Sequence, residues 1–403
     1  MTQILITGAG PTGAALALLL VKRGIAVTLI EAAKDFHRVF RGEALMPSGL
    51  DALEQMGLSA ILERIPHRQF DAWEFIFDGK QLFRVEEPMG APQPCTLVSQ
   101  PPLLEAMIKE AQAYPGFEFI QGVVVKDLLW INNRVAGVKL GDGREISAQI
   151  VIGTDGRNSV VRQRAGLQLL PQPNNVDVLW FKLAASPRFA ADNVFCSIVN
   201  DGHVFSIFHG AEEGKLHLAW AVFADEKADD KTDWKQANWT EIFASLSPSW
   251  MAQHFRSHAD TIETPIKLSV VVGRCPCWHA PGVLLLGDAA HPMSPVRAQG
   301  INVALRDVIV AANHLVPLFH AGAAHEEIDA ALARIQAERE PEIIRIQQLQ
   351  MEEAAQGEQL RKNALMRWVL IQLAPLLRKI IQQFWLKRQH ELRQGITQVH
   401  LSV

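Results

Sequence analysis

The sequence predicts an α/β fold with a parallel sheet, an inserted antiparallel sheet and a helical C-terminal region. The first observation is an apolar run, a glycine-rich turn, a helical stretch and a second apolar run within residues 1–31. The second is a series of alternating segments joined by turn residues at 70–85 and 176–272. The third is the composition after residue 326, which is rich in Ala, Gln, Glu, Leu and Arg and has no strand pattern.

The N-terminal stretch is typical of a βαβ unit of a parallel sheet. Residues 3–7 and 26–31 are apolar strand candidates, and residues 14–23 between them follow helical spacing until Gly24. Apolar runs at 149–154 and 282–287 also end in turn residues, so we expect them in the same sheet. The predicted first domain is therefore discontinuous and comprises residues 1–69, 95–175 and 276–325.

The inserted segments are predicted to form a second domain, of residues 70–94 and 176–275, that binds the substrate. Asp78-Gly79 is a hairpin signal, and further turns are expected at 200–202 and 212–214. In the strand candidate 215–223, alternate residues are apolar and the residues between them face the other way. Such a two-faced antiparallel sheet can form the wall of a ligand pocket.

The C-terminal region, residues 326–403, is predicted to be helical. Apolar residues recur every three or four positions from Leu365 to Phe384, and Pro375 predicts a break or a kink, with two amphipathic helices favoured over one. Residues 357–403 hold eight Lys and Arg but two Glu. Packing on the body or self-association as a homodimer is favoured for these helices, and peripheral contact with an anionic membrane is the alternative.

Composition excludes several classes of protein. The 403 residues have a net charge of −4, with 48% hydrophobic and 20% charged residues, so neither a disordered chain nor a nucleic-acid partner is expected. Four irregularly spaced cysteines favour a reducing compartment, the cytoplasm, over a disulfide framework. Cys275 and Cys277 lack a second Cys/His pair, so no metal site is predicted. The apolar stretch 14–21 is too short for a signal or a membrane span.

A G-x-G-x-x-G motif lies between the first strand and the first helix. Its residues are Gly8, Gly10, Pro11, Thr12 and Gly13. The glycines allow a tight turn, close approach of a pyrophosphate and close helix packing, and the helix N-terminus supplies N–H donors. Glu31 ends the second strand, where a carboxylate can accept both hydroxyls of an adenosine ribose. The motif predicts a Rossmann-like dinucleotide site without distinguishing NAD from FAD.

A second motif distinguishes them through a resemblance. Gly287-Asp288 follows the run 282–287, and Pro295, Gly300, Ile301, Asn302 and Asp307 come after it. This cluster resembles the class A flavoprotein monooxygenases related to para-hydroxybenzoate hydroxylase, in which the Gly-Asp pair binds the ribitol of FAD and the next helix begins beside the flavin. Residues 153–162 resemble the Asp-Gly fingerprint of that family and include Asp155. Arg41 resembles the family arginine near the pyrophosphate, and Gln100 the glutamine near the ribose.

The resemblance implies a reaction. NADH or NADPH reduces FAD, O2 reacts with the reduced flavin, and a flavin hydroperoxide hydroxylates an aromatic or similarly electron-rich small molecule. The protein then mainly orients the substrate and excludes water, so no catalytic dyad is required. Pro295 and Arg297 are the residues expected nearest the reaction.

Arg297 departs from the family pattern, which has small residues at this position. Its cation either holds an anionic group of the substrate or the reduced flavin, or it points outward into solvent or pairs with a surface acid. His291 and the sheet histidines 203, 209 and 217 are expected to be structural.

Three other functions stay open at this point. A flavin halogenase is disfavoured because the Trp-x-Trp-x-Ile-Pro motif of that group is absent. An NAD-dependent dehydrogenase would leave Gly287-Asp288 unexplained. A flavin-binding oxidoreductase or binding protein that does not hydroxylate is the main alternative, because of Arg297 and Ala298.

Overall fold

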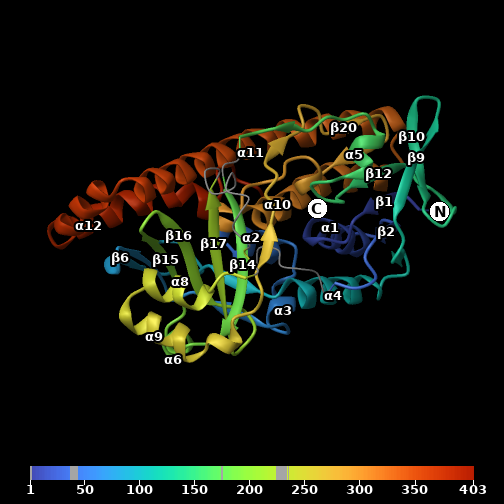
Figure 1. Ribbon diagram of the computed structural model, residues 1–403. Coiled ribbons are helices and arrows are strands. Elements are labelled where there is room, and N and C mark those ends of the chain that lie inside the picture. The colour runs from blue at the N-terminus through green and yellow to red at the C-terminus, as the bar shows by residue number, and fades with distance from the viewer. Residues whose placement is uncertain (1, 37–43, 174–175, 224–233, 235) are drawn as a thin grey trace.

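The computed structural model describes residues 2–36, 44–173, 176–223, 234 and 236–403, and Figure 1 shows its two main sheets and the long C-terminal helices. The first sheet has six strands, in the order β20 (His279–Ala280), β21 (Val283–Leu285), β12 (Ile150–Gly153), β1 (Ile4–Thr7), β2 (Val27–Glu31) and β8 (Phe117–Gln121). All neighbours in it are parallel except β20 and β21. The predicted βαβ unit and the distant runs 149–154 and 282–287 are confirmed as parts of one sheet.

Helices cover this sheet because its strands are apolar on both faces, as parallel strands usually are. Helix α1 (Pro11–Lys22) contacts both α4 (Gln100–Ala111) and α10 (Gln299–Ala321). Residues 14–20 of α1 are fully buried. The stretch 296–321 is long and apolar enough to cross a membrane, but 78% of its most apolar window is buried inside the protein. It is therefore used here as a core helix.

The second sheet has seven strands. Their order is β18 (Ile266–Leu268), β14 (Val176–Ala184), β17 (Lys215–Phe223), β16 (His203–His209), β15 (Val194–Asn200), β5 (Ala72–Phe77) and β6 (Lys80–Glu86). The hairpin at Asp78-Gly79 is confirmed, with both residues at positive φ. The expectation of a purely antiparallel sheet is wrong at one place, since β5 and β15 are parallel. More than a hundred residues separate these two strands, so no tight hairpin constrains their direction.

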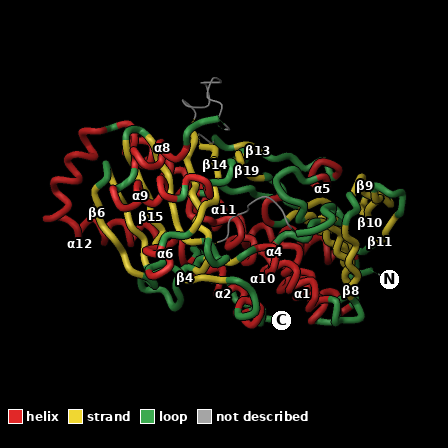
Figure 2. Tube along the Cα trace, turned by 60° about the horizontal axis from the view of Figure 1, so that its bottom comes forward, coloured by secondary structure: helices red, strands yellow, loops and turns green. Residues whose placement is uncertain are grey.

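The two faces of the second sheet have different neighbours. Leu216, Leu218, Trp220 and Val222 pack with α8 (Trp239–Leu246) and α9 (Ser249–Ser257) on the outer face. The other face carries an aromatic cluster that reaches the C-terminal helices. Figure 2 shows α8 and α9 on one side of these strands.

The C-terminal region is helical, as predicted, but Pro375 does not end a helix. Helix α11 (His325–Lys362) is followed by α12 (Ala364–Gln394), which continues through Pro375. Pro375 is exposed, so water can satisfy the carbonyl that loses its N–H partner. The boundary lies instead at Asn363, whose side chain accepts a hydrogen bond from the amide of Met366 at 2.9 Å. Residues 395–403 then return to the first sheet's side of the molecule, beside α2 (Pro47–Gln55) and α10.

The remaining elements connect or flank the two main sheets. Three small sheets are formed by β9 (Val125–Ile131), β10 (Arg134–Leu140) and β11 (Glu145–Ser147), by β3 (Ala44–Leu45), β7 (Thr96–Val98) and β4 (His67–Gln69), and by β13 (Leu170–Pro171) and β19 (Gly273–Arg274). Short helices are α3 (Ser59–Leu62), α5 (Val160–Arg164), α6 (Pro187–Ala191), η1 (Ala259–Thr261), η2 (Gly287–Ala289) and η3 (Val296–Ala298). The residue ranges given above for the three domains stay a prediction.

Candidate functional site

The glycine turn between β1 and α1 has the form that a bound pyrophosphate requires. A Cβ on Gly13 would lie 2.0 Å from the carbonyl oxygen of Gly8, and a Cβ on Gly8 would lie 2.6 Å from that of Thr154. By contrast, a Cβ on Gly10 would meet no atom of the described residues within 4 Å. Gly8 and Gly13 are therefore fixed by packing, whereas Gly10 leaves open space at the N-terminus of α1, where N–H groups favour an anion.

Glu31 lies beside this turn at the end of β2. Its carboxylate is 3% exposed and accepts hydrogen bonds from the amides of Ala9, at 2.8 Å, and Ala33, at 2.7 Å. Carboxylate oxygens can each accept more than one hydrogen bond. The carboxylate is thus held next to the glycine turn, in the position expected for a ribose partner.

The second motif meets the first in space. Gly287 has a φ of +58°, and a Cβ there would lie 2.5 Å from Oγ1 of Thr12 in the glycine turn. Asp288 follows it on an exposed position, and a Cβ on Gly300 would lie 3.8 Å from its Oδ1. The structure therefore brings Thr12, Gly287, Asp288 and Gly300 together at the start of α10, although they lie up to 288 positions apart in the sequence.

The third motif joins the first two through hydrogen bonds. Oγ1 of Thr154 donates to the carbonyls of Thr7, at 2.8 Å, and Gly8, at 2.7 Å. Asp155 accepts from the hydroxyl of Ser159 and from the amides at the start of α5, and burial raises the pKa of its carboxyl even though these hydrogen bonds oppose the shift. Arg162 donates to the carbonyl of Ala289, at 2.8 Å. In this structure the motif holds the loops of the site together.

Other predicted cofactor residues lie in the same region with different roles. The side chain of Asn302 is fully buried and holds the backbone of Ala44, Met46 and Ala298, so it fixes the start of α10 against the neighbouring strand and loop. Ile301 is buried beside it, and Gln100 is the first residue of α4. Arg41 lies outside the described residues.

The loop before α10 has an unusual backbone. Arg297 and Ala298 both adopt left-handed conformations, with φ of +60° and +50°, two positions after the exposed Pro295. Two consecutive non-glycine residues in this region cost about 1–3 kcal/mol each and persist only where the surroundings enforce them. Gln350 enforces it here, since its side-chain amide donates to the carbonyls of Ser294, at 2.8 Å, and Val296, at 2.7 Å.

Arg297 itself is turned away from solvent. Its guanidinium pairs with Glu353 at 2.8 Å, and both side chains are 12% exposed. The same guanidinium lies 5.3–5.8 Å from the ring centres of Trp73, Phe75 and Trp385. Of the two interpretations of Arg297, pairing with an acid is the one that the contacts support, but that acid is buried on α11 and does not lie at the surface.

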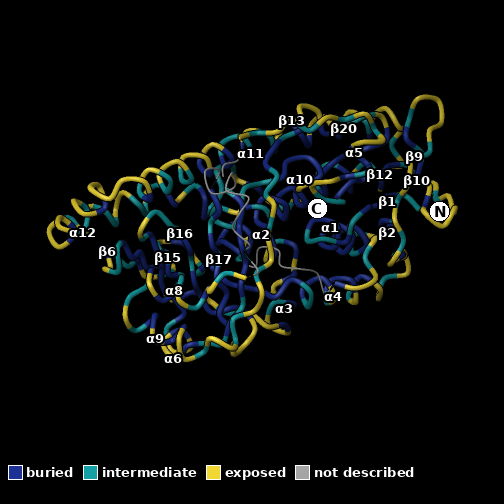
Figure 3. The backbone as a smooth tube through the Cα atoms, viewed as in Figure 1, coloured by how far each residue is buried: buried dark blue, intermediate teal, exposed yellow. Residues whose placement is uncertain are grey.

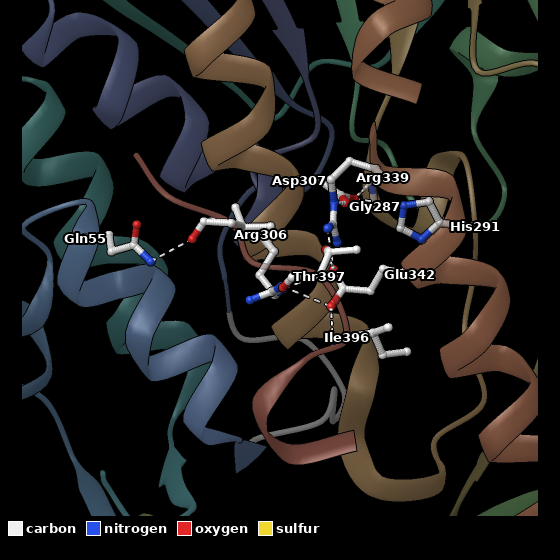
Figure 4. Close-up of polar contacts among 10 residues, drawn as sticks. Gln55, Gly287, His291, Arg306, Asp307, Arg339, Glu342, Ile396 and Thr397 are labelled. Atoms are coloured by element: carbon white, nitrogen blue, oxygen red, sulfur yellow. Dashed lines mark hydrogen bonds and ion pairs between the residues drawn. The ribbon is translucent and has the colours of Figure 1, made fainter. Parts of the chain in front are cut away.

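A buried network of charged side chains contacts the second motif, and the sequence analysis did not predict it (Figure 4). His291 and Arg339 both contact Asp307, each at 2.8 Å. Arg339 also pairs with Glu342, which in turn holds Arg306 at 3.0 Å. Asp307 further accepts from the amide of Gly287 at 3.2 Å. The available signal was the pair Arg339 and Glu342, spaced three apart on a predicted helix and followed by Ile343 and Ile346.

The histidines expected to be structural have structural contacts. His291 is 1% exposed and lies against the ring of Trp278. On the second sheet, His209 is hydrogen-bonded to the carbonyl of Gly210 at 2.8 Å, and burial lowers the pKa of its imidazole. His217 is buried against Trp180 and Phe208, and His203 packs against Trp220.

Comparisons with known proteins agree with this geometry. A family model described as "FAD binding domain" matches residues 1–344. The 6-methylpretetramide 4-monooxygenase of Streptomyces rimosus is 29% identical, over 87% of this chain and 83% of that protein. The 3-demethoxyubiquinol 3-hydroxylase of Escherichia coli is 27% identical, over 76% of this chain and 78% of that protein.

A solved structure shows the same fold. Pseudomonas aeruginosa PqsL, in complex with 2-aminobenzoylacetate, superposes with a TM-score of 0.79 at 22% identity, over 92% of this chain and 99% of that one. The turn at Gly10, the carboxylate of Glu31 and the Asp288 position fit a FAD molecule, whose bound flavin supplies hydride acceptance from NAD(P)H and activation of O2. The chain therefore belongs to the FAD-binding-domain family and is a class A FAD-dependent monooxygenase.

Proposed function

We propose that this monooxygenase hydroxylates a neutral, ring-containing phenolic compound bound between the loop 295–298 and the aromatic face of the second sheet. The observation that carries the proposal is the aromatic cluster on that face. Phe195 stacks on Phe208 with ring centres 5.3 Å apart, and Phe70 meets both rings edge-on at 5.8 Å. Ala298 of the flavin-side loop packs against the same cluster.

The cluster favours a planar apolar substrate. Aromatic rings attract other rings in stacked and edge-on arrangements, and burial of a ring contributes through the area removed from water. Both curated relatives reported above are named as oxygenases of ring compounds, 6-methylpretetramide and 3-demethoxyubiquinol. These names support the class of substrate and do not identify it.

Charge favours a neutral substrate over an aromatic acid. Arg297 is the cation expected nearest the reaction, and Glu353 already balances its charge. An added carboxylate at this loop would have to compete with a buried, hydrogen-bonded acid. We therefore assign Arg297 a positioning role. The cofactor contacts are assigned to Gly8, residues 10–13, Glu31, Arg41, Gln100, Asp155, Gly287, Asp288, Pro295 and residues 300–302.

The test compares matched phenols and aromatic acids with the FAD-loaded enzyme. We expect a neutral phenol to stimulate NADH or NADPH oxidation and O2 uptake together, with one hydroxylated product per nicotinamide oxidised, and the acid of the same ring size to stimulate less. Stimulation by the acids alone would contradict the choice of substrate. Nicotinamide oxidation without a hydroxylated product from any compound would favour the protein that binds flavin but does not hydroxylate.

Assembly and location are part of the proposal. We infer a cytoplasmic enzyme from its cysteine usage, and a homodimer stays a prediction that light scattering at several protein concentrations would test.

A further inference from the structure

Helix α12 carries a row of large apolar side chains that the protein body does not cover. Figure 3 shows exposed positions along this helix, which extends beyond the second sheet. The row and its exposed fractions are Leu365 70%, Val369 38%, Leu373 39%, Leu376 82%, Ile380 50% and Phe384 69%, with Met366 40% and Trp368 58% beside it. Helix α12 itself packs on the body through other side chains, as one expectation for this region held, and this row is what that packing leaves uncovered.

The spacing makes the row one continuous surface. Its members follow each other at intervals of three or four residues, which places them on one side of a helix, over about 28 Å of its length. Residues at other helical positions hold α12 to the protein. Trp385 packs against Phe75 and Phe83, and Arg367 pairs with Asp78 at 2.9 Å. The helix is thus anchored while the apolar row stays exposed.

The charges of α12 are of one sign along the row. From residue 364 to 390 the sequence contains no Asp or Glu, whereas Arg378, Lys379 and Lys387 are exposed. The whole chain, by contrast, has a net charge of −4. An apolar row bordered by cations complements a surface that is apolar inside and anionic outside.

We propose that the exposed face of α12 docks onto an anionic lipid bilayer, parallel to its surface. A second copy of the chain fits less well, because pairing two α12 faces would bring two sets of cations together without acids between residues 364 and 390 to balance them. The proposal does not depend on the hydroxylation chemistry. It does place the aromatic cluster, which contacts α12 through Trp385, on the membrane side of the enzyme.

Substitution tests this surface better than truncation. Residues after α12 are bound into the first sheet's side of the molecule, for example through the amide of Leu401, which donates to Gln55 at 2.8 Å. Removing the entire C-terminal region would therefore disturb the fold as well as the surface. The variant L376Q/F384Q replaces two of the three most exposed members of the row. The control I131Q/L170Q changes two side chains of 61% and 53% exposure elsewhere.

The experiment is cosedimentation of the full-length, FAD-loaded protein with vesicles. We expect binding to vesicles of phosphatidylcholine with phosphatidylserine, weaker binding to phosphatidylcholine alone, and weakening by salt. L376Q/F384Q should reduce binding about tenfold or more, and I131Q/L170Q should leave it unchanged. Light scattering of the same proteins reports self-association.

Either of two results would overturn the proposal. One is a wild-type protein that does not cosediment with the anionic vesicles. This result includes the case in which light scattering shows a dimer that L376Q/F384Q abolishes. The other is cosedimentation that L376Q/F384Q and I131Q/L170Q reduce equally. Because vesicle binding needs no turnover, failure here is distinguishable from failure of the proposed hydroxylation.

Discussion

Gly10 is the residue whose substitution should weaken cofactor binding without disturbing the packing of the protein. Its φ of −72° is ordinary for alanine, and a Cβ would meet no described protein atom within 4 Å. We therefore expect Gly10→Ala to fold normally but to bind FAD about tenfold or more weakly, because the methyl group occupies space that a pyrophosphate needs. Titration of the apoprotein with FAD, followed by flavin fluorescence, measures the change.

A matched control for this prediction is Gly357→Ala on α11. This position is equally open, is helical and has no positive φ, so alanine should leave FAD affinity unchanged. If Gly10→Ala and Gly357→Ala bound FAD equally well, the pyrophosphate would not lie against Gly10. Gly13→Ala is unsuitable for this comparison because its Cβ would collide with the Gly8 carbonyl.

Glu353 is expected to control the loop before α10 through Arg297. Burial opposes its ionisation, but Arg297, together with Arg388 and Gln389, holds the pKa of the Glu353 carboxyl below its ordinary value. Glu353→Gln should leave FAD affinity near that of the wild type but lower the yield of hydroxylated product per NAD(P)H several-fold, because the strained loop loses its ion pair. The product yield and the hydrogen peroxide released are the two measurements.

The pH dependence of the product yield distinguishes a positioning role of Glu353 from a general structural effect of its substitution. A carboxyl whose pKa is lowered in the folded protein stays charged above that pKa, so the wild-type yield should stay flat from neutral pH down to the ordinary carboxyl value of 4.5 and fall only below it. Glu353→Gln should show a low yield throughout this range. Glu241→Gln, at an exposed pair with Arg256, is the control and should match the wild type. A wild-type yield in Glu353→Gln would remove Arg297 from its positioning role.

At the scale of elements, sequence patterns predicted the features that depend on residues close together in the chain. The glycine turn, the hairpin at Asp78-Gly79 and the C-terminal helices follow from short stretches of sequence. The meeting of Arg297 with Glu353 does not, because it depends on where α11 crosses the loop, 56 residues later. Likewise, nothing near Asn302 indicates that its side chain holds the backbone of Met46, 256 residues away. Such contacts are set by tertiary packing, which residue periodicity does not encode.

Helix α12 gives a prediction at this scale, because it contains a proline that the sequence favoured as a break. A proline inside a helix costs about 3 kcal/mol relative to alanine, whereas one in the first turn costs little. Pro375→Ala should therefore raise the stability of α12 by about 1–3 kcal/mol, and Pro187→Ala, at the start of α6, should have almost no effect. Hydrogen exchange of the α12 amides measures the difference. Equal exchange in Pro375→Ala and the wild type would mean that the helix is interrupted there.

At the scale of the whole molecule, the C-terminal segment, residues 396–403, connects α11 to α2. The amide of Ile396 donates to Glu342 at 2.8 Å, and the hydroxyl of Thr397 does so at 3.2 Å. Val399 is 5% exposed and its carbonyl accepts from Gln55 at 3.0 Å. Through Glu342 this segment joins the network of Arg339 and Asp307 that supports Gly287 (Figure 4). The contacts that support Gly287 therefore extend to residues more than a hundred positions after it.

Removal of residues 396–403 should lower the free energy of unfolding by about 3 kcal/mol, from lost apolar burial and lost hydrogen bonds at about 1 kcal/mol each. The effect should depend on pH. Burial opposes ionisation of Glu342, but Arg339 and Arg306, with the amide of Ile396, hold the pKa of its carboxyl below the ordinary 4.5. A lowered pKa stabilises the folded state above 4.5 and this stabilisation is lost as the pH falls through the folded value, so the wild type should weaken below about pH 4.5.

Without the segment, the pKa of Glu342 should rise toward its ordinary value, so acid destabilisation should begin at a higher pH than in the wild type. Urea unfolding of both proteins at several pH values, with saturating FAD, measures this shift. Leu365→Gln, on the exposed row of α12, serves as the control, because a surface change there leaves Glu342 and its partners intact. A shortened protein with the wild-type stability and the same acid limit would show that the C-terminal segment lies on the network without stabilising it.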